Sequence, residues 1–275
     1  MVNLNHPNLS LEVIERIIDI VTEHENDPSS IKACSLVSHS ILPRCRYHIF
    51  ASVTLNARVG KRAISPTSDD FNHLLSNSPH LAVYVRDLDY HFNKREFVAK
   101  RLPWLISMFK KLVKLQELRI TYWPTSSTRR LDWMSSSERK VLLPLLHLST
   151  LTSISLSTIQ NFALADLSGC VNLKELRIES LYFSTGVGSY LEALPDTPVM
   201  LERLVIDKGN VGPLRRFCNA RRPDGKPIIG LSSLKEIEAT VLRLDLLKDL
   251  FVMCRNLRQI TLSSMSLPHL ISSSI

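Results

Sequence analysis

The 275-residue chain has few aromatic residues, few cysteines and no long hydrophobic run. Aromatic side chains make up 7% of it, and its five cysteines lack the short paired spacing that a zinc site requires. No run of about eighteen uncharged apolar residues occurs, so we expect no membrane-spanning helix. The N-terminal residues lack the basic leader and apolar core of a signal peptide. These features favour a reducing compartment, the cytoplasm or the nucleus.

Motifs of nucleotide-binding and hydrolytic sites are also missing. The chain contains no G-x-x-x-x-G-K-[ST], G-x-G-x-x-G, H-E-x-x-H or G-x-S-x-G. Gly186 and Gly188 come nearest to a phosphate loop, but two glycines before a tyrosine are more typical of a turn. Cys34 and Cys45 flank His39, yet the spacing of Cys34 places it on an apolar helix face. We therefore expect no catalytic residue, no metal site and no cofactor.

Charge, in contrast, is abundant, with a formal net charge of +8 and a pI near 9.4. Such a protein could bind nucleic acid, although a surface of that kind usually interleaves basic with aromatic residues. Basic residues concentrate between 208 and 226, where Leu214, Phe217 and Cys218 predict a core-facing helix side. We interpret this segment as a helix with a solvated basic face followed by a turn, in preference to a dedicated binding loop.

The first fifty residues predict two short helices joined by a turn. In the first helix the apolar residues Leu9, Val13, Ile17 and Ile20 recur at helical spacing, and further apolar residues widen this stripe. So broad an apolar surface on a short helix should have two packing partners. The second helix begins at Ile31, and Pro43 should end it by removing a backbone donor.

This segment resembles an F-box of the fungal type. The resemblance is carried by Leu9, Glu12, Val13, Ile17, Ile18, Ile31, Cys34, Leu36, Val37, Ser38, Arg44, Arg46 and Phe50. Residues 71–90 are similar to the segment that comes after the box in that family. The family's Leu-Pro opening is Leu9-Ser10 here, and its usual Trp near the end of the second helix is Ile41, which should reduce the contact area or rigidity of the box.

F-box proteins are substrate receptors of SCF-type cullin-RING ubiquitin ligases. The resemblance implies a helical F-box at residues 7–50 that binds the ligase adaptor and, through it, the cullin. It implies that the rest of the chain holds an unknown protein substrate, without catalysis of its own. The implied adaptor-binding residues are Leu9, Ser10, Glu12, Val13, Ile17, Ile31, Leu36, Val37 and Ile41. A ligase-independent scaffold with a degenerate F-box is the main alternative, and a nucleic-acid-binding repeat protein is a weaker one.

A repeat of the form L-x-x-L-x-L comes after the box. Copies, some of them degenerate, begin at residues 50, 85, 115, 151, 173, 201, 234 and 257. The end of each copy alternates with period two, which predicts a short strand with one buried face. Apolar residues precede the copies, as at Leu105, Phe109 and Leu112, so each repeat is predicted to be helix, loop, strand. Cys170 and Cys254 occupy one of these apolar positions and are predicted to be core residues.

This pattern resembles the leucine-rich repeat fold. It implies an α/β solenoid over residues 51–275, shaped as an arc with a parallel sheet on the inner face and helices outside. The family's Asn or Cys after each strand is replaced by Trp123, Ile159, Leu181, Leu242 and Met265. An apolar residue cannot bond the loop backbone as Asn does, so the curvature should be irregular.

The outward-facing strand residues predict an acidic inner face on a basic protein. Eight acids oppose three bases there, a net charge of −5. The acids are Asp87, Asp89, Glu117, Glu175, Glu179, Asp207, Glu236 and Glu238, and the bases are Arg119, Arg177 and Arg203. We expect the substrate to bind this face through a basic or polar segment, with Val205 as an apolar anchor. The predicted substrate-binding set is Asp87, Asp89, Glu117, Arg119, Glu175, Arg177, Arg203, Val205, Glu236 and Glu238.

Overall fold

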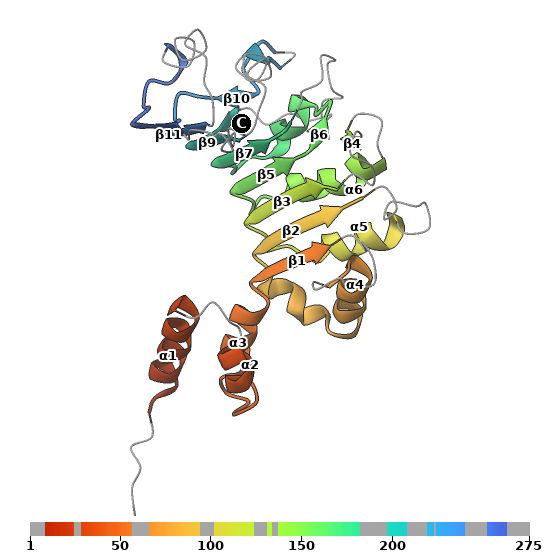
Figure 1. Ribbon diagram of the computed structural model, residues 1–275, viewed down its shortest axis with the longest axis vertical. Coiled ribbons are helices and arrows are strands. Elements are labelled where there is room, and N and C mark those ends of the chain that lie inside the picture. The colour runs from red at the N-terminus through yellow and green to blue at the C-terminus, as the bar shows by residue number, and fades with distance from the viewer. Residues whose placement is uncertain are drawn as a thin grey trace, which may run out of the picture.

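The centre of the fold is an eight-stranded sheet (Figure 1). The structure is a computed structural model that describes residues 9–24, 29–56, 66–93, 102–123, 131–133, 137–181, 197–207, 219–222, 224–239 and 252–262. The strands lie in chain order, and each is parallel to its neighbours. They are β1 (Ser52–Asn56), β2 (Asp87–Phe92), β3 (Glu117–Tyr122), β5 (Ser153–Ser157), β7 (Glu175–Glu179), β9 (Arg203–Asp207), β11 (Glu236–Ala239) and β12 (Gln259–Leu262). The parallel sheet and all eight predicted strands are therefore confirmed.

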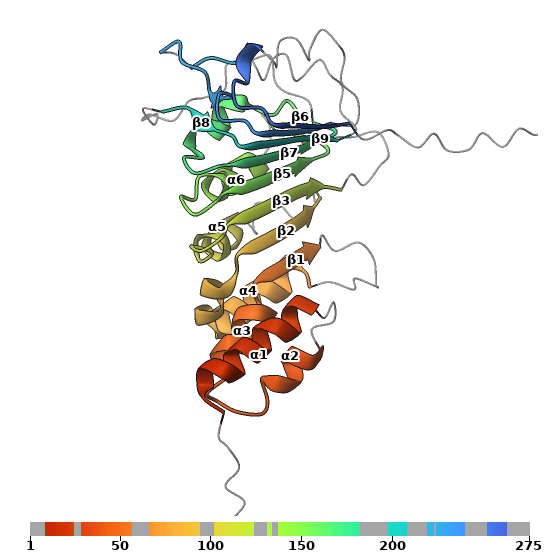
Figure 2. The ribbon, with the colours of Figure 1, turned by 90° about the vertical axis from the view of Figure 1, so that its left-hand side faces the viewer.

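Helices cover one face of this sheet and leave the other uncovered by any described element (Figures 1 and 2). The covering elements are α4 (Ser68–Asn77), α5 (Leu102–Lys110), α6 (Ser137–Leu146) and the 3-10 helices η1 (Pro79–Tyr84) and η2 (Leu164–Gly169). Strand residues such as Leu88, Leu118 and Leu176 point toward the helices and are buried. Their neighbours alternate to the opposite side, which we call the open face.

The predicted helix before each strand is only partly confirmed. Helices precede β2, β3 and β5, and Leu105, Phe109 and Leu112 are buried as predicted. Before β7 the short 3-10 helix η2 takes this place. Two predicted elements lie outside the described residues: the helix near Phe217 and most of the helical face ending at Cys254.

The connections also contain small parallel pairs and a buried ion pair. Strand β4 (Leu131–Asp132) pairs with β6 (Ile159–Gln160), and β8 (Val199–Met200) pairs with β10 (Ile229–Gly230). In α6, Arg139 donates two hydrogen bonds of 2.7 Å to Asp166, whose side chain is 1% exposed. Nε1 of Trp133 donates a third, also 2.7 Å long. This network satisfies a buried carboxylate and ties η2 to α6.

Polar side chains link successive repeats at the turn before the strand. Asn172 donates to the carbonyl of Ser149 (2.6 Å), and Asn256 donates to the carbonyl of Ser232 (2.8 Å). Thr150 bonds the carbonyl of Leu115 in the same way. At the position where the family carries Asn after the strand, Ile159 and Leu181 are buried core residues, whereas Trp123 is half-exposed. In the described repeats the turns before the strands thus carry polar links between neighbours.

The N-terminal segment forms three helices, whereas the sequence predicted two. They are α1 (Leu11–His24), α2 (Ser29–Cys34) and α3 (Leu42–Ile49). The prediction for Pro43 was wrong, because Pro43 lies in the first turn of α3 and does not end α2. A proline is tolerated there because the first backbone N–H groups of a helix have no intrahelical acceptor. The three helices enclose a small core of Ile18, Ile31, Ile41 and Cys45.

One aspartate joins the first and third of these helices. Both carboxylate oxygens of Asp19 accept hydrogen bonds of 2.6 Å from Arg44, and Nε2 of His48 lies 2.9 Å from Oδ1. The hydrogen bonds from Arg44, opposed by burial and assisted by His48, lower the pKa of Asp19 to about 2. The guanidinium of Arg86 lies over the ring of Tyr47, 5.0 Å from its centroid, and links α3 to the sheet.

Candidate functional site

The helices α1 to α3 expose an unusual amount of apolar surface. Seven of the thirteen exposed large hydrophobic side chains in the described residues lie between positions 9 and 37: Leu9, Leu11, Val13, Ile17, Ile20, Leu36 and Val37. Val13, Ile17 and Ile20 form a stripe along α1, at i, i+4 and i+7. The adjacent stripe, with Ile14 and Ile18, packs on the small core. Helix α1 thus has two apolar faces, as its sequence predicted, and no described residue covers one of them.

The predicted adaptor-binding residues divide into two groups. Leu9, Val13, Ile17, Leu36 and Val37 are exposed, Leu36 and Val37 at 88% and 77% in the turn after α2. Glu12 and Ser10 are also exposed, and the Ser10 carbonyl accepts a hydrogen bond from the backbone N–H of Val13.

Ile31 and Ile41 are the exceptions, because they are 2% and 7% exposed inside the small core. Placing them on a contact surface was wrong. Their contribution is to hold α2 and α3 against α1.

On the open face, the side chains form straight rows across the strands. One row runs Ser52, Asp87, Glu117, Ser153, Glu175, Arg203, Glu236 and Gln259. The next runs Thr54, Asp89, Arg119, Ser155, Arg177, Val205, Glu238 and Thr261. Every predicted substrate-binding residue lies in these two rows. The register therefore brings together residues up to 151 positions apart in the chain, from Asp87 to Glu238.

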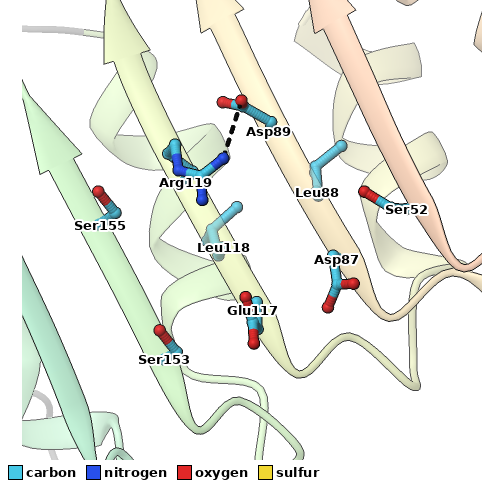
Figure 3. Close-up of a pocket in the computed structure, with 9 residues that line it drawn as sticks. All are labelled: Ser52, Asp87, Leu88, Asp89, Glu117, Leu118, Arg119, Ser153 and Ser155. Atoms are coloured by element: carbon cyan, nitrogen blue, oxygen red, sulfur yellow. Dashed lines mark hydrogen bonds and ion pairs between the residues drawn. The ribbon is translucent and has the colours of Figure 1, made fainter. Parts of the chain in front are cut away.

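A hollow of about 120 Å³ opens on this face over β1, β2, β3 and β5 (Figure 3). It is lined by Ser52, Asp87, Leu88, Asp89, Glu117, Leu118, Arg119, Ser153 and Ser155. Asp87 and Glu117 lie side by side near the starts of their strands. Burial, together with the negative charge of Glu117, raises the pKa of Asp87. Asp87 therefore resists ionisation more than an ordinary aspartate does.

The second row of the hollow is electrically balanced. Nη1 of Arg119 donates to Oδ2 of Asp89 at 3.1 Å, and Nε2 of His91 lies 3.1 Å from Oδ1. Burial alone would raise the pKa of Asp89, but His91 and Arg119 outweigh burial and lower it. Trp123 follows β3 with its ring edge-on to His91, 5.8 Å between centroids, and is 50% exposed.

The other half of the open face is organised around Arg203. Its guanidinium lies 3.1 Å from Glu238, 3.5 Å from Glu236 and 3.6 Å from Glu175. Three of the five acids predicted for this half therefore share one cation. Val205 lies in the same row as Arg177 and Glu238 but is only 2% exposed, so its proposed role as an apolar anchor was wrong.

The cysteines are placed as the repeat pattern predicted. Cys170 and Cys254 are 1% and 4% exposed, and the thiol of Cys170 donates to the carbonyl of Leu146 at 3.0 Å. Burial raises the pKa of Cys254 to about 11 and that of Cys170 still further. Both therefore act as core residues. Within the basic segment, Arg222 is 6% exposed and pairs with Asp224 at 2.9 Å, so it does not belong to a solvated basic face.

Nothing in the described parts of the chain forms a metal site or a membrane-spanning helix. No group of three or more metal-ligating side chains occurs among the described residues. The helices described are all too short or too polar to cross a bilayer. Gly186 and Gly188 lie outside the described residues. The described surfaces instead carry an apolar stripe on the helices and a charged hollow on the sheet.

Several residues of the hollow were not predicted. Ser52, Ser153 and Ser155, together with His91 beside Asp89, were missed because the sequence count considered only carboxylates and permanent cations on the outward positions. The signal that could have found them is the same alternation that identified Asp87 and Glu117. A comparison with protein-family models and with curated proteins finds no match for this chain.

Proposed function

We propose that the protein is the substrate receptor of an SCF-type cullin-RING ubiquitin ligase. In this proposal α1 to α3 form an F-box that binds the ligase adaptor. The repeats form a leucine-rich-repeat-like arc whose open face holds the protein to be ubiquitinated. The observation that carries the proposal is the exposed stripe Val13, Ile17 and Ile20, with Leu36 and Val37, on a small helical unit that already has its own core.

The physical reason is the cost of leaving this stripe in water. A fully buried Val or Ile side chain contributes roughly 1.5–3 kcal/mol relative to an exposed one. Exposed hydrophobic side chains gathered in one place mark interaction sites more often than scattered ones do. The family resemblance assigns four of these residues, Val13, Ile17, Leu36 and Val37, to the adaptor contact. A docking role at one end and an open face at the other fit a receptor that bridges two proteins.

The test is binding of the purified chain to a purified SCF adaptor, measured by calorimetry and by co-elution. We expect a one-to-one complex with the wild type and none with Ile17→Asp, because a carboxylate would be buried in an apolar contact. Val113→Asp is the matched control, since Val113 is also about half-exposed but lies beyond α5, in the repeats. Unchanged affinity in a folded Ile17→Asp variant would refute the F-box assignment.

The same preparation separates the alternatives. Failure to bind the adaptor, together with salt-sensitive retention on heparin, would favour a nucleic-acid-binding protein. Failure in both assays would favour a scaffold that acts without the ligase, with the three helices serving to cap the sheet.

A further inference from the structure

The strongest unused feature of the open face is the carboxylate pair of Asp87 and Glu117. The two residues are direct register partners on β2 and β3, where neighbouring parallel strands lie about 4.8 Å apart. Like charges placed directly opposite each other destabilise a sheet. In the described part of the chain neither carboxylate forms an ion pair with a lysine or arginine. The fold thus retains a pair that repels itself.

Four other acids of this face lie beside a cation. Asp89 has Arg119 and His91, and Glu175, Glu236 and Glu238 share Arg203. Asp87 and Glu117 differ from these acids because no described lysine or arginine lies within ion-pair distance of either of them, although the protein as a whole is basic.

The surroundings of the pair suit a cationic side chain. The hollow of about 120 Å³ could hold roughly four water molecules, or the head group of a lysine or arginine in their place. The hydroxyls of Ser52 and Ser153 flank the carboxylates and can accept hydrogen bonds from further N–H groups of a ligand. Arg119 is held at the opposite side by Asp89, so it does not fill the space.

An apolar contact lies along the same strand. Trp123 is six residues beyond Glu117, so strand alternation places its side chain on the open face as well. At about 3.3 Å per residue the two are roughly 20 Å apart, the length of about six residues of extended chain. Half-exposed tryptophans are frequent anchors in protein interfaces.

We propose that the face over β1, β2, β3 and β5 binds an extended protein segment that contains lysine or arginine. Its cationic group lies between Asp87 and Glu117, and an apolar residue about six positions away contacts Trp123. To call this segment the ubiquitination substrate rests on the receptor function proposed above, whereas its chemistry follows from the face itself. Nucleic acid is disfavoured here, because its phosphates would meet two carboxylates.

The test uses a fluorescently labelled decapeptide of alternating arginine and serine that ends in leucine, with the full-length chain and anisotropy as the readout. The same peptide with glutamate for arginine should not bind. The double variant Asp87→Asn with Glu117→Gln should weaken binding about tenfold, which corresponds to about 1.4 kcal/mol. The matched control, Glu175→Gln with Glu236→Gln, removes two carboxylates from the same row and should change affinity less than twofold.

A loss in the control as large as that in the Asp87 and Glu117 variant would overturn the proposal, as would no loss in the latter. Trp123→Ala should weaken binding severalfold, and an unchanged affinity would remove the apolar contact from the proposal. Adaptor binding, measured in parallel, distinguishes the two claims. Peptide binding that depends on Asp87 and Glu117 without adaptor binding would overturn only the ligase receptor. Adaptor binding without such peptide binding would overturn only the ligand class.

Discussion

The N-terminal helices and the open face of the sheet are both exposed surfaces, but they satisfy their side chains in opposite ways. On the helices the carboxylate of Asp19 is paired with Arg44, and apolar groups such as Ile17 are left in water. On the sheet the apolar residues are buried beneath, and the carboxylates of Asp87 and Glu117 are left without an ion pair in the described residues. The pKa of Asp19 is accordingly lowered, whereas that of Asp87 is raised. The helices thus expose apolar side chains, and the sheet exposes carboxylates without an ion pair. We expect each surface to bind a partner that supplies the complementary groups.

The largest expected difference between the two regions is in thiol reactivity. Cys34 is partly exposed between the short helices, whereas Cys170 is buried under the sheet with a raised pKa. Native labelling with a thiol reagent, followed by mass spectrometry, should modify Cys34 at least about a thousandfold faster, because Cys170 reacts only after opening of the core. Rapid labelling of Cys170 or Cys254 would show that the repeat register is wrong.

A smaller effect is expected from Asp19→Asn, which should destabilise the helices by roughly 2 kcal/mol at pH 7. The folded pKa of about 2 lies below the ordinary value of 3.8, so this stability is present above about pH 4 and is lost as the pH falls toward 2. Hydrogen exchange of α1 and α3 measures it. Glu23→Gln, at an exposed site of the same helix, should have no effect. Equal protection in both variants at pH 7 would contradict the prediction.

Adaptor binding should be weakened by mutations in the N-terminal helices and unaffected by mutations on the sheet. Val37→Asp should weaken adaptor binding about tenfold or more, because a side chain that is 77% exposed would become charged in an apolar contact. Changing Glu117, Glu175 and Glu236 together to Lys should leave adaptor affinity unchanged and weaken capture of the arginine peptide. Loss of adaptor binding in a folded triple variant would contradict the proposal that the adaptor binds the helices and not the open face.

The smallest effect, and the one with the opposite sign to Asp19, is expected at Asp87. Its folded pKa is raised, so the ionised carboxylate reduces stability at neutral pH, and this cost disappears as the pH falls and the group is protonated. Asp87→Asn should therefore stabilise the protein by less than about 1 kcal/mol at pH 7, with a smaller gain at acidic pH. Thermal unfolding at both pH values measures this. A lower melting temperature at pH 7 would contradict the proposed repulsion.

The repeat was predictable because its signals are local. The alternation of Leu118 and Ile120 with Glu117 and Arg119 is a property of neighbouring residues, and it predicted strands, faces and burial correctly. The second N-terminal helix was not predictable in the same way. Apolar spacing continued from Ile31 to Ile41, but the chain turns after Cys34 because burial of Ile31 and Ile41 in one small core requires a bend between them.

The candidate site was likewise predictable from the sequence only in part. That Asp87 and Glu117 face outward followed from the sequence, as did the acidic character of the face. The sequence did not show which acids lie beside a cation. Arg203 reaches Glu175 on one side and Glu236 and Glu238 on the other only because of the strand register. Likewise Val205 has an outward position in the pattern but is covered by its surroundings.

The sequence by itself determined the order of eight parallel strands, the residues that face the core, and the presence of an apolar helical segment before them. These features were predictable because the strand period of two residues and the helix period of 3.6 residues are patterns among residues close together in the chain. Only the tertiary structure decided that Ile17 is exposed while Ile31 is buried, and that Asp87 and Glu117 have no ion pair among the described residues while Glu236 has one. Those outcomes depend on distances between segments far apart in the chain, which no local pattern specifies.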